Sequence, residues 1–584
     1  MMDEKILDGY VTYEAFGARG DGVTDDIEAI KAAHDYANEH RLNVRTNPNA
    51  TYYIGSRPIT VTVKTCVDWG TSKFIIDDRE VKIEERRASV FKIASYYDAF
   101  EFHIDSLKKN QMKLDVNFER NCYVKVENSE KKQFIRYGLN CNSGSSQTDC
   151  FVMDGTGYIL NPVIWDFEKV TSAVARPIDE TLLTVRGGDF TTISNQAESK
   201  YNYHSRNIAV LRSNVLLERI SHKITGELDH GAPYGGFISI DNCAYVTLRD
   251  SFFTGRMIYQ TIGAAGKPVS MGSYAILISN CVNVKLENVR QYNIMDGKRW
   301  GLMASNHCRD LYLDGCVMSR FDAHENVVNL TIKNTTLGHQ CFNAIGHGNM
   351  VVENVIAYGN SFLNLRPDYG SSWDGSVSFR NCTWYPKASN TSPAFIGGSN
   401  SGGHDFGFPC YMPHEINIEN LHICDSEHTS GYSGAKLFDI NKTRHNGCGE
   451  LDYSDCGVKS PYFFTEKVTV KGVVCDSGKG FKLFSDDTAV CFATKRHNVG
   501  DGMFKANFRA LIEDTELSCD SIIPVTSLTA DDFESNYHLV PRIELKNCTN
   551  FVYKKGNTPA VIMLNDCAVK EFDTNGAAKI FVSE

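Results

Sequence analysis

The stretch "YEAFGARGDGVTDDIEAIKAA", residues 13–33, joins a glycine-rich turn to an amphipathic segment that continues to residue 40. The apolar side chains of that segment recur at the spacing of a helix with one buried face. The expected buried face consists of Ile27, Ile30, Ala33, His34 and Ala37. The stretch therefore predicts a turn followed by a helix that covers an apolar surface.

The carboxylates in this stretch favour an architectural role. Thr24 or Asp25 suits the N-cap of the helix, and the acidic residues from Asp25 to Glu28 lie at the positive end of the helix dipole. The tripeptide Arg19-Gly20-Asp21 is interpreted as part of the same turn. Because an amphipathic helix is a natural cover for the open end of a stack of strands, we expect a cap here and no active site.

A repeated pattern begins near residue 215 and predicts such a stack. Each unit is a short strand of alternating apolar residues, one polar residue, and then Asn, Asp or Gly, as in "VTLRDS" at 246 and "LTIKNT" at 330. This turn residue recurs at steps of 38, 27, 19, 20, 27 and 39 residues. The turn residues are Asp250, Asn288, Gly315, Asn334, Asn354, Asn381 and Asn420.

These features predict an all-β fold, a parallel β-solenoid. Alternating side chains suit strands, and Asn, Asp and Gly tolerate the left-handed backbone that a corner requires. Stacked rungs bury one continuous apolar column, so no rung needs to be stable alone. Helical repeats are the structural alternative. They would place apolar residues at i, i+3, i+4 and i+7, whereas these units alternate with a period of two.

The pattern divides the chain into three parts. Residues 1–70 are expected to form the N-terminal cap and the first rungs, and residues 181–584 the main parallel β-helix. Residues 71–180 lack the repeat and contain hairpin signals such as Asp154-Gly155, which predicts a small inserted β-subdomain. Residues 425–465 are rich in Gly and Ser, so we expect a long loop that walls a cleft.

Net charge, apolar runs and the N-terminal segment limit the partners and the location that we expect for the chain. A net charge of −11 over 584 residues disfavours nucleic acid, whose binders need a basic face. No apolar run reaches the roughly 18 residues of a membrane span, so no membrane partner is expected. The start, "MMDEKILDGY", has neither an apolar core nor a cleavage-site pattern. We expect a cytoplasmic protein, or a secreted one whose signal has been removed, and a homo-oligomer is compatible with the sequence.

The 19 cysteines agree with a reducing compartment. They show no CxxC pair and no spacing typical of a metal site, so no metal is expected. Several occupy one recurring position directly after the turn residue or an equivalent Asn, which predicts buried free thiols and not disulfides. These are Cys243, Cys281, Cys316, Cys382 and Cys548.

The segment from residue 13 to residue 33 strongly resembles the N-terminal signature of the pectate-lyase-like right-handed parallel β-helix superfamily. The repeats extend this resemblance over most of the chain. The superfamily includes polysaccharide lyases, polygalacturonase-like glycoside hydrolases and phage tailspikes. The resemblance implies a right-handed parallel β-helix with an N-terminal capping helix and a carbohydrate partner. It names no single reaction, because one fold hosts several activities.

Residues that can carry chemistry are densest between residues 296 and 374. Side chains at equal offsets from the same corner of a solenoid stack into columns, so we expect acids, histidines and arginines to line a common surface. Trp300 and Trp373 are expected to supply flat apolar faces for sugar rings. The expected substrate-binding residues are Asp296, Arg299, Trp300, His324, His339, His347, Arg366 and Trp373.

The clearest local motif is "LRPDYGSSWDG", residues 365–375, which contains Asp368 and Asp374. Glycoside hydrolysis needs two carboxyl groups, one to protonate the leaving oxygen and one to attack the sugar or activate water. We expect Asp368 and Asp374 to supply this catalytic pair, with Asp322 as a rival for one role. The structural alternatives are that Asp374 starts a turn with Gly375, that Asp368 caps a corner, and that Asp322 lies on a polar surface strand.

Three functions are compatible with these residues. The first is a glycoside hydrolase that acts on an oligo- or polysaccharide without a cofactor. The second is a polysaccharide lyase, in which Arg299 or Arg366 abstracts a proton beside a uronate carboxylate, often with Ca²⁺. The third is a non-catalytic, tailspike-like glycan binder. Gly346-His347-Gly348 is similar to the Gly-His-Gly of polygalacturonase-like hydrolases, but their Asn-Thr-Asp and Arg-Ile-Lys motifs are not found.

Overall fold

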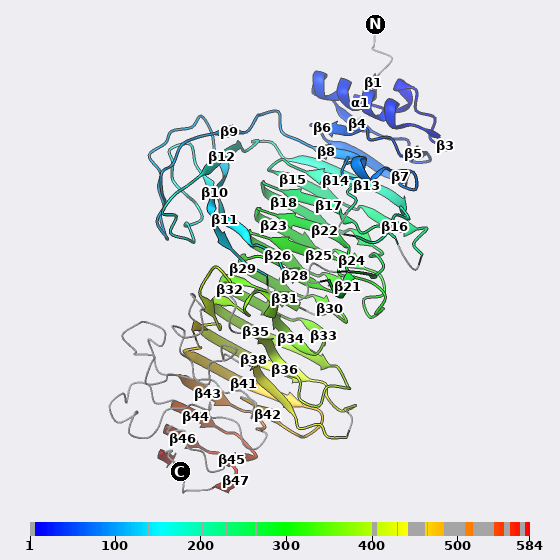
Figure 1. The fold of residues 1–584 in the computed structure, drawn as a ribbon. Coiled ribbons are helices and arrows are strands. Elements are labelled where there is room, and N and C mark those ends of the chain that lie inside the picture. The colour runs from blue at the N-terminus through cyan, green and yellow to red at the C-terminus, as the bar shows by residue number, and fades with distance from the viewer. Residues whose placement is uncertain are drawn as a thin grey trace. The chain divides into compact units, whose positions relative to one another are not determined.

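The chain divides into two compact units, both built almost entirely of strands (Figure 1). Unit 1 comprises Met1–Lys131 and Ser146–Asp322, and unit 2 comprises Lys132–Ser145 and Ala323–Glu584. The computed structural model describes residues 6–136, 141–200, 203–228, 231–262, 266–340, 342–399, 406–428, 430–441, 462–463, 465–483, 508–517, 542–553, 561–572 and 579–583.

In unit 1, strands from successive turns of the chain pair in parallel to form the rungs of a right-handed parallel β-helix. The strands of one sheet are β7 (Val67–Asp77), β13 (Leu183–Ile193), β15 (Val215–Glu218), β18 (Ala244–Arg249), β23 (Val282–Glu287) and β26 (Cys308–Asp314). Those of the other are β6 (Val61–Val63), β8 (Phe91–Ile93), β14 (Ile208–Val210), β17 (Gly235–Asp241), β22 (Tyr274–Ser279) and β25 (Met303–Asn306). The predicted fold class is confirmed.

Unit 2 repeats this architecture. One sheet contains β29 (Val327–Lys333), β32 (Gly346–Glu353), β35 (Trp373–Pro386), β38 (Glu415–Ile423), β41 (Lys467–Cys475), β43 (Arg509–Glu513), β44 (Arg542–Lys546), β46 (Val561–Asn565) and β48 (Lys579–Ser583). A second sheet contains β31 (Phe342–Ala344), β34 (Ser361–Leu365), β36 (Ala394–Ser399), β39 (Ala435–Asn441) and β42 (Phe481–Lys482). Of the predicted loop 425–465, residues 429, 442–461 and 464 lie outside the described part of the chain.

The turn residues of the sequence repeat make the corners of the rungs. At all seven positions φ is positive, from 48° at Asn334 to 65° at Gly315. In unit 2 their side chains also form a ladder along the stack. The Nδ2 amide donates to the Oδ1 of the preceding corner at 3.0 Å (Asn354 to Asn334), 3.3 Å (Asn381 to Asn354) and 3.0 Å (Asn420 to Asn381). The corner therefore fixes both the backbone turn and the register of neighbouring rungs.

Apolar side chains stack inside each unit in the predicted columns. In unit 1, Val246 pairs with Val284, which pairs with Leu311, and none of the three is more than 1% exposed. Full burial of such a side chain contributes about 1.5–3 kcal/mol, so a continuous column stabilises rungs that are each too short to fold alone.

Helix α1 (Ile27–His40) covers the first rungs of unit 1 (Figure 1). Its buried residues are the five predicted from the sequence. Tyr13 anchors the helix, because its hydroxyl lies 2.9 Å from His34 Nε2 and accepts a hydrogen bond from Trp69 Nε1 at 3.0 Å. The predicted N-cap is wrong by one residue. Asp26 holds that position, but its carboxylate turns back to accept hydrogen bonds from the backbone of the preceding turn.

An antiparallel sheet lies between β8 and β13 in the sequence. It consists of β9 (Phe100–Glu101), β10 (Cys122–Gln133), β11 (Ser145–Met153) and β12 (Ser172–Pro177), in the order β11-β10-β12-β9. It has a hydrophobic core of its own, which includes Val124, Phe151 and Phe167. The expected range 71–180 also includes the end of β7 and all of β8. Both strands are rungs of the β-helix and not part of the antiparallel sheet.

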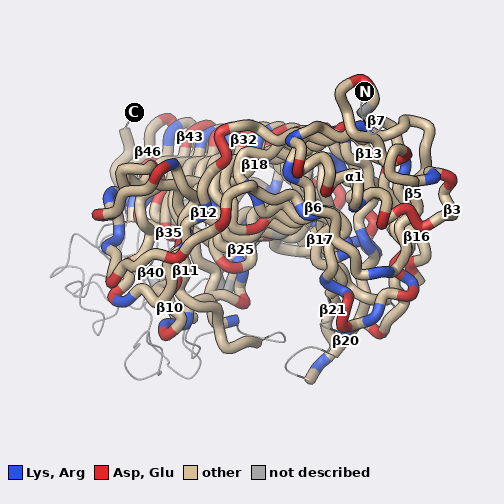
Figure 2. The backbone as a smooth tube through the Cα atoms, turned by 90° about the horizontal axis from the view of Figure 1, so that it is seen from above, with Lys and Arg blue, Asp and Glu red and all other residues tan. Residues whose placement is uncertain are grey.

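The cysteine and charge patterns match this architecture. The five cysteines at the recurring position are free and buried, as predicted. Acidic and basic residues are interspersed along the strands of each unit and do not gather over one set of strands (Figure 2). In the described part of the chain, no helix is long and apolar enough to cross a membrane.

Replacing Asn381 tests the corner ladder. Asn381→Ala removes two side-chain hydrogen bonds, each worth about 0.5–1.5 kcal/mol, and leaves an alanine in the left-handed region, which costs about 1 kcal/mol more. We expect the urea midpoint, followed by circular dichroism, to fall clearly. Asn381→Gly keeps the backbone conformation, so its urea midpoint should fall less than that of Asn381→Ala. Equal midpoints for wild type and both variants would show that the ladder contributes nothing.

Candidate functional site

His347 and Asp374 face each other on neighbouring rungs of unit 2. β32 and β35 pair with His347 opposite Asp374, and His347 Nε2 lies 3.9 Å from Asp374 Oδ2. Each residue lies seven positions before the corner of its own rung, Asn354 and Asn381. Asp374 therefore lies within a strand and does not begin a turn with Gly375, which excludes one structural alternative.

Asp374 is also bound by the next rung. His414 Nε2 lies 2.8 Å from Asp374 Oδ1, and His414 Nδ1 lies 3.8 Å from a carboxylate oxygen of Glu466. On the opposite side, His347 Nδ1 lies 2.6 Å from Asn326 Oδ1. The Asp374 carboxylate thus lies between two imidazoles, and each ring has a second polar neighbour that fixes its orientation.

The electrostatics of this group suit proton transfer. The hydrogen bond with Asp374 raises the pKa of His414 above its usual value, with a smaller contribution from the Glu466 carboxylate. The side chains of Asp374 and His414 are 19% and 35% exposed, so the pair is open to a ligand. The ring of Tyr411 lies 5.4 Å from that of His414, and burial raises its pKa to about 12, which keeps the phenol neutral.

Asp368 is held by two arginines. Arg136 Nε lies 2.6 Å from Asp368 Oδ2, and Arg366 donates from Nε to Oδ1 at 3.2 Å and from Nη2 to Oδ2 at 2.8 Å. Burial alone would raise the pKa of Asp368, but the guanidinium charges of Arg366 and Arg136 outweigh it and lower the pKa. Asp368 is therefore an ionised carboxylate that is unsuited to donate a proton at neutral pH.

Arg136 comes from the segment that connects β10 and β11. Phe134 packs against Phe408 with ring centroids 4.6 Å apart, and the Ile135 amide donates to the Phe406 carbonyl at 3.3 Å. Gly407 has φ +75°, and a Cβ there would lie 2.6 Å from the Lys132 carbonyl, so this approach requires glycine. The segment Lys132–Ser145, which belongs to unit 2, thus contributes a charged residue to the site.

Four predicted site residues belong to unit 1. Arg299 lies between two acids, with Nη1 3.5 Å from Glu227 and Nε 3.6 Å from Asp296. Asp322 is fully buried, and its Oδ2 accepts hydrogen bonds from Arg320 Nε at 2.8 Å, from Arg320 Nη2 at 2.5 Å and from the Tyr274 hydroxyl. Asp322 therefore does not lie on a polar surface strand, and its catalytic role stays a prediction.

The two tryptophans predicted to bind sugar, Trp300 and Trp373, differ in how deeply they are buried. Trp373 is a core residue with an exposure of 0%, and its Nε1 donates to the Gly348 carbonyl at 3.0 Å. The prediction that it stacks on a sugar is wrong, because alternate residues of a strand face opposite sides and Asp374 takes the outward side. Trp300, in unit 1, is half-buried with the Arg320 guanidinium 5.0 Å from the ring centroid, and its sugar-binding role stays a prediction.

The remaining predicted residues lie in unit 2. His324 and His339 are half-buried, and their roles stay predictions. The sequence reasoning missed His414, Glu466, Asn326 and Arg136. A signal for two of them exists, since His414 and Glu466 each lie six positions before a corner residue, Asn420 and Gly472. Arg136 has no such signal, because it lies 232 residues from Asp368 in the sequence and outside the repeat.

No protein-family model matches the chain, and no curated protein is significantly similar to it in sequence. Among solved structures, the tailspike of Pseudomonas phage phi297 is similar with a TM-score of 0.44 and 11% identity, over 80% of this chain and 81% of that one. The tailspike of Acinetobacter baumannii bacteriophage AP22, solved with A. baumannii capsular saccharide, gives 0.45 and 10%, over 83% and 81%. PfbA, a surface adhesin of Streptococcus pneumoniae, gives 0.30 and 12%, over 97% and 93%.

The interaction between Asp374 and His414 predicts a measurable pKa difference. In Asp374→Asn the carboxylate charge is lost, so the pKa of His414 should fall, as followed by NMR of protein carrying ¹³Cε1-labelled histidine. Because the folded-state pKa of His414 is raised, the stability that it contributes is present below about pH 6.5 and is lost as the pH rises through the folded value. An unchanged His414 titration in Asp374→Asn would contradict this interaction.

The Arg136–Asp368 ion pair predicts the local stability of the segment that carries Arg136. Arg136→Gln removes a charge-assisted hydrogen bond of about 1.5–3 kcal/mol, so amide exchange in residues 132–136 and 141–145 should accelerate roughly tenfold or more. The measurement is hydrogen–deuterium exchange by mass spectrometry. Lys131→Gln, which changes an exposed residue next to the segment, is the control. Identical exchange in both variants would mean that Asp368 does not hold the segment.

Proposed function

We propose that the chain is a glycoside hydrolase whose active site lies in unit 2 around Asp374. The observation that carries this proposal is the 2.8 Å contact between Asp374 Oδ1 and His414 Nε2 in a partly exposed group, with an ionised carboxylate, Asp368, six residues away. Such a hydrolase needs one group that gives a proton and one carboxylate that stays charged. The parallel β-helix agrees with the proposal but does not name the reaction.

In this mechanism the Asp374–His414 pair is the acid and base. The pair shares a proton across its hydrogen bond, and Asp374 raises the pKa of His414, which favours the protonated ring. The proton passes to the glycosidic oxygen as the bond to the sugar breaks. The same pair then accepts a proton from the water that completes hydrolysis. His347, 3.9 Å from the other carboxylate oxygen, keeps Asp374 oriented.

Asp368 supplies the second function. Its negative charge stabilises the positive charge that develops on the sugar ring in the transition state, or it attacks the anomeric carbon directly. Arg136 and Arg366 fix the carboxylate in place and keep it ionised. The assignment of separate roles follows from the environments, since one carboxylate lies beside histidines and the other between arginines.

A lyase reaction with an arginine base fits the contacts less well. Arg366 is paired with Asp368, and Arg299 is paired with Glu227 and Asp296, so both guanidinium groups already bind carboxylates. An arginine that acts as a base would have to leave these partners. Glycan binding without cleavage remains the other reading of the same group. The two differ in whether a product forms.

The proposal predicts that loss of Asp374 and loss of His414 lower the rate of cleavage by similar factors. Purified protein is incubated with a panel of bacterial capsular, exopolysaccharide and plant polysaccharides, and new reducing ends are measured. We expect Asp374→Asn and His414→Asn each to lower the rate on the cleaved substrate about 10²–10⁴-fold. Glu419→Gln, an exposed acidic residue of the same unit, should leave the rate unchanged.

Three outcomes would count against the proposal. Full activity in Asp374→Asn would show that the Asp374 carboxylate takes no part in the reaction. Product that absorbs as an unsaturated uronate would indicate a lyase. Binding of a polysaccharide by the wild-type chain without release of product would indicate a binder.

A further inference from the structure

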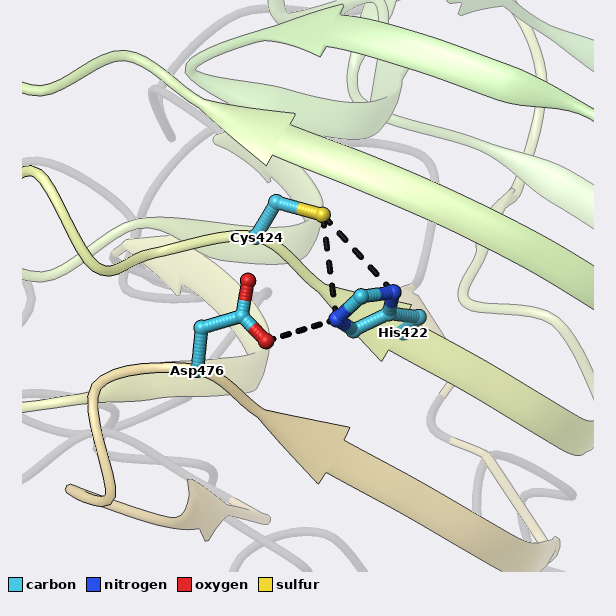
Figure 3. A group of neighbouring side chains, drawn as sticks. All are labelled: His422, Cys424 and Asp476. Carbon is cyan, nitrogen blue, oxygen red and sulfur yellow. Dashed lines mark hydrogen bonds and ion pairs between the residues drawn. The ribbon is translucent and has the colours of Figure 1, made fainter.

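A second group of polar side chains lies on the outer surface of unit 2 (Figure 3). His422 belongs to β38, Cys424 follows that strand, and Asp476 follows β41. His422 Nε2 lies 2.7 Å from Asp476 Oδ1, and Cys424 Sγ lies 3.8 Å from both ring nitrogens of His422. The three possible ligand atoms all lie within 4.8 Å of one another.

The strand register explains why these residues meet. Ile423 pairs with Cys475, so the residues that follow them, Cys424 and Asp476, are neighbours on adjacent rungs. Ile423 and Cys475 point into the core with exposures of 0% and 6%. The alternation of the strand therefore turns the residues on either side of Ile423 outward, and 48% of the His422 side chain is exposed.

This group is separate from the proposed catalytic group. His414 precedes the corner at Asn420 by six residues, whereas His422 follows that corner by two. No contact of His422, Cys424 or Asp476 enters the mechanism above. What the group offers is a different chemistry, since it combines an imidazole, a thiol and a carboxylate.

These ligand types and distances suit zinc. Zn²⁺ binds sulfur, nitrogen and oxygen at about 2.0–2.3 Å, which places tetrahedral ligands roughly 3.3–3.8 Å apart. The Sγ–N distances of 3.8 Å are at the upper end of that range. The 2.7 Å between His422 and Asp476 has to widen by about half an ångström, and rotation of exposed side chains provides this.

We propose that His422, Cys424 and Asp476 bind one Zn²⁺ ion that links β38 to β41, with the fourth position open to water. Three protein ligands and one open position are a known coordination pattern for this metal. Binding replaces the His422–Asp476 hydrogen bond, and the Cys424 thiol releases its proton to solvent as the sulfur–zinc bond forms. The inference is independent of the proposed hydrolase function.

The test is a calorimetric titration with ZnCl₂ at pH 7.5 on the full chain after treatment with a chelator. We expect the wild type to bind one more zinc than the variant His422→Ala/Cys424→Ser/Asp476→Asn, and each single substitution to weaken that site at least about tenfold. Cys66→Ser, which removes another partly exposed thiol far from the group in sequence, should bind as the wild type does.

Cobalt gives a second readout of the same site. Co²⁺ should produce a thiolate-to-metal absorption band in the wild type and in Cys66→Ser but not in Cys424→Ser. Thermal unfolding without metal shows whether the variants are folded. His422 and Asp476 are exposed and Cys424 is half-buried, so we expect little change in the unfolding temperature. Equal zinc stoichiometry and affinity in wild type and triple variant, with a cobalt band that survives in Cys424→Ser, would overturn the proposal.

Discussion

The left-handed corner is the constraint on which the structure depends. Asn334, Asn354, Asn381 and Asn420 each hold φ near +50°, and each later amide donates to the corner before it. A corner that is bonded to its neighbours cannot slide by one residue, and a slip of one residue would turn every apolar side chain outward. The corner therefore fixes which side chains face the core and which face a ligand.

The proposed site is a direct consequence of that register. His347 and Asp374 lie seven positions before a corner, and His414 and Glu466 lie six positions before one. Counting backwards from the corners aligns His347 with Asp374 and His414 with Glu466, and the two pairs differ by one position. Counting forwards from the preceding corner does not align these residues. The rungs differ in length, and the extra residues lie between the preceding corner and the strand. Asp368 lies in such an extra segment, where its ionisation is set by arginines and not by the column.

Much of the fold could be predicted from the sequence because its signals are local. The buried face of α1, the corner residues and the buried cysteines each follow from the chemistry of a few adjacent residues. The site was only partly predictable, because it depends on contacts between distant segments. Arg136 lies 232 residues from Asp368, and the zinc ligands His422 and Asp476 lie 54 residues apart, so no short spacing motif in the sequence identifies either pair. Trp373 was misplaced because its strand begins one residue before Asp374, which assigns the indole to the core.

The polar side chains around Asp374 are the proposed binding site of the glycan. The most direct measurement is a crystal structure of the Asp374→Asn protein with an oligosaccharide fragment of a polysaccharide that the wild type cleaves. We expect a sugar in unit 2 with its glycosidic oxygen within about 3 Å of the side chain at position 374. A sugar bound only elsewhere, for example in the unit 1 cavity of about 320 Å³ lined by Arg41, Lys64 and Tyr96, would contradict it.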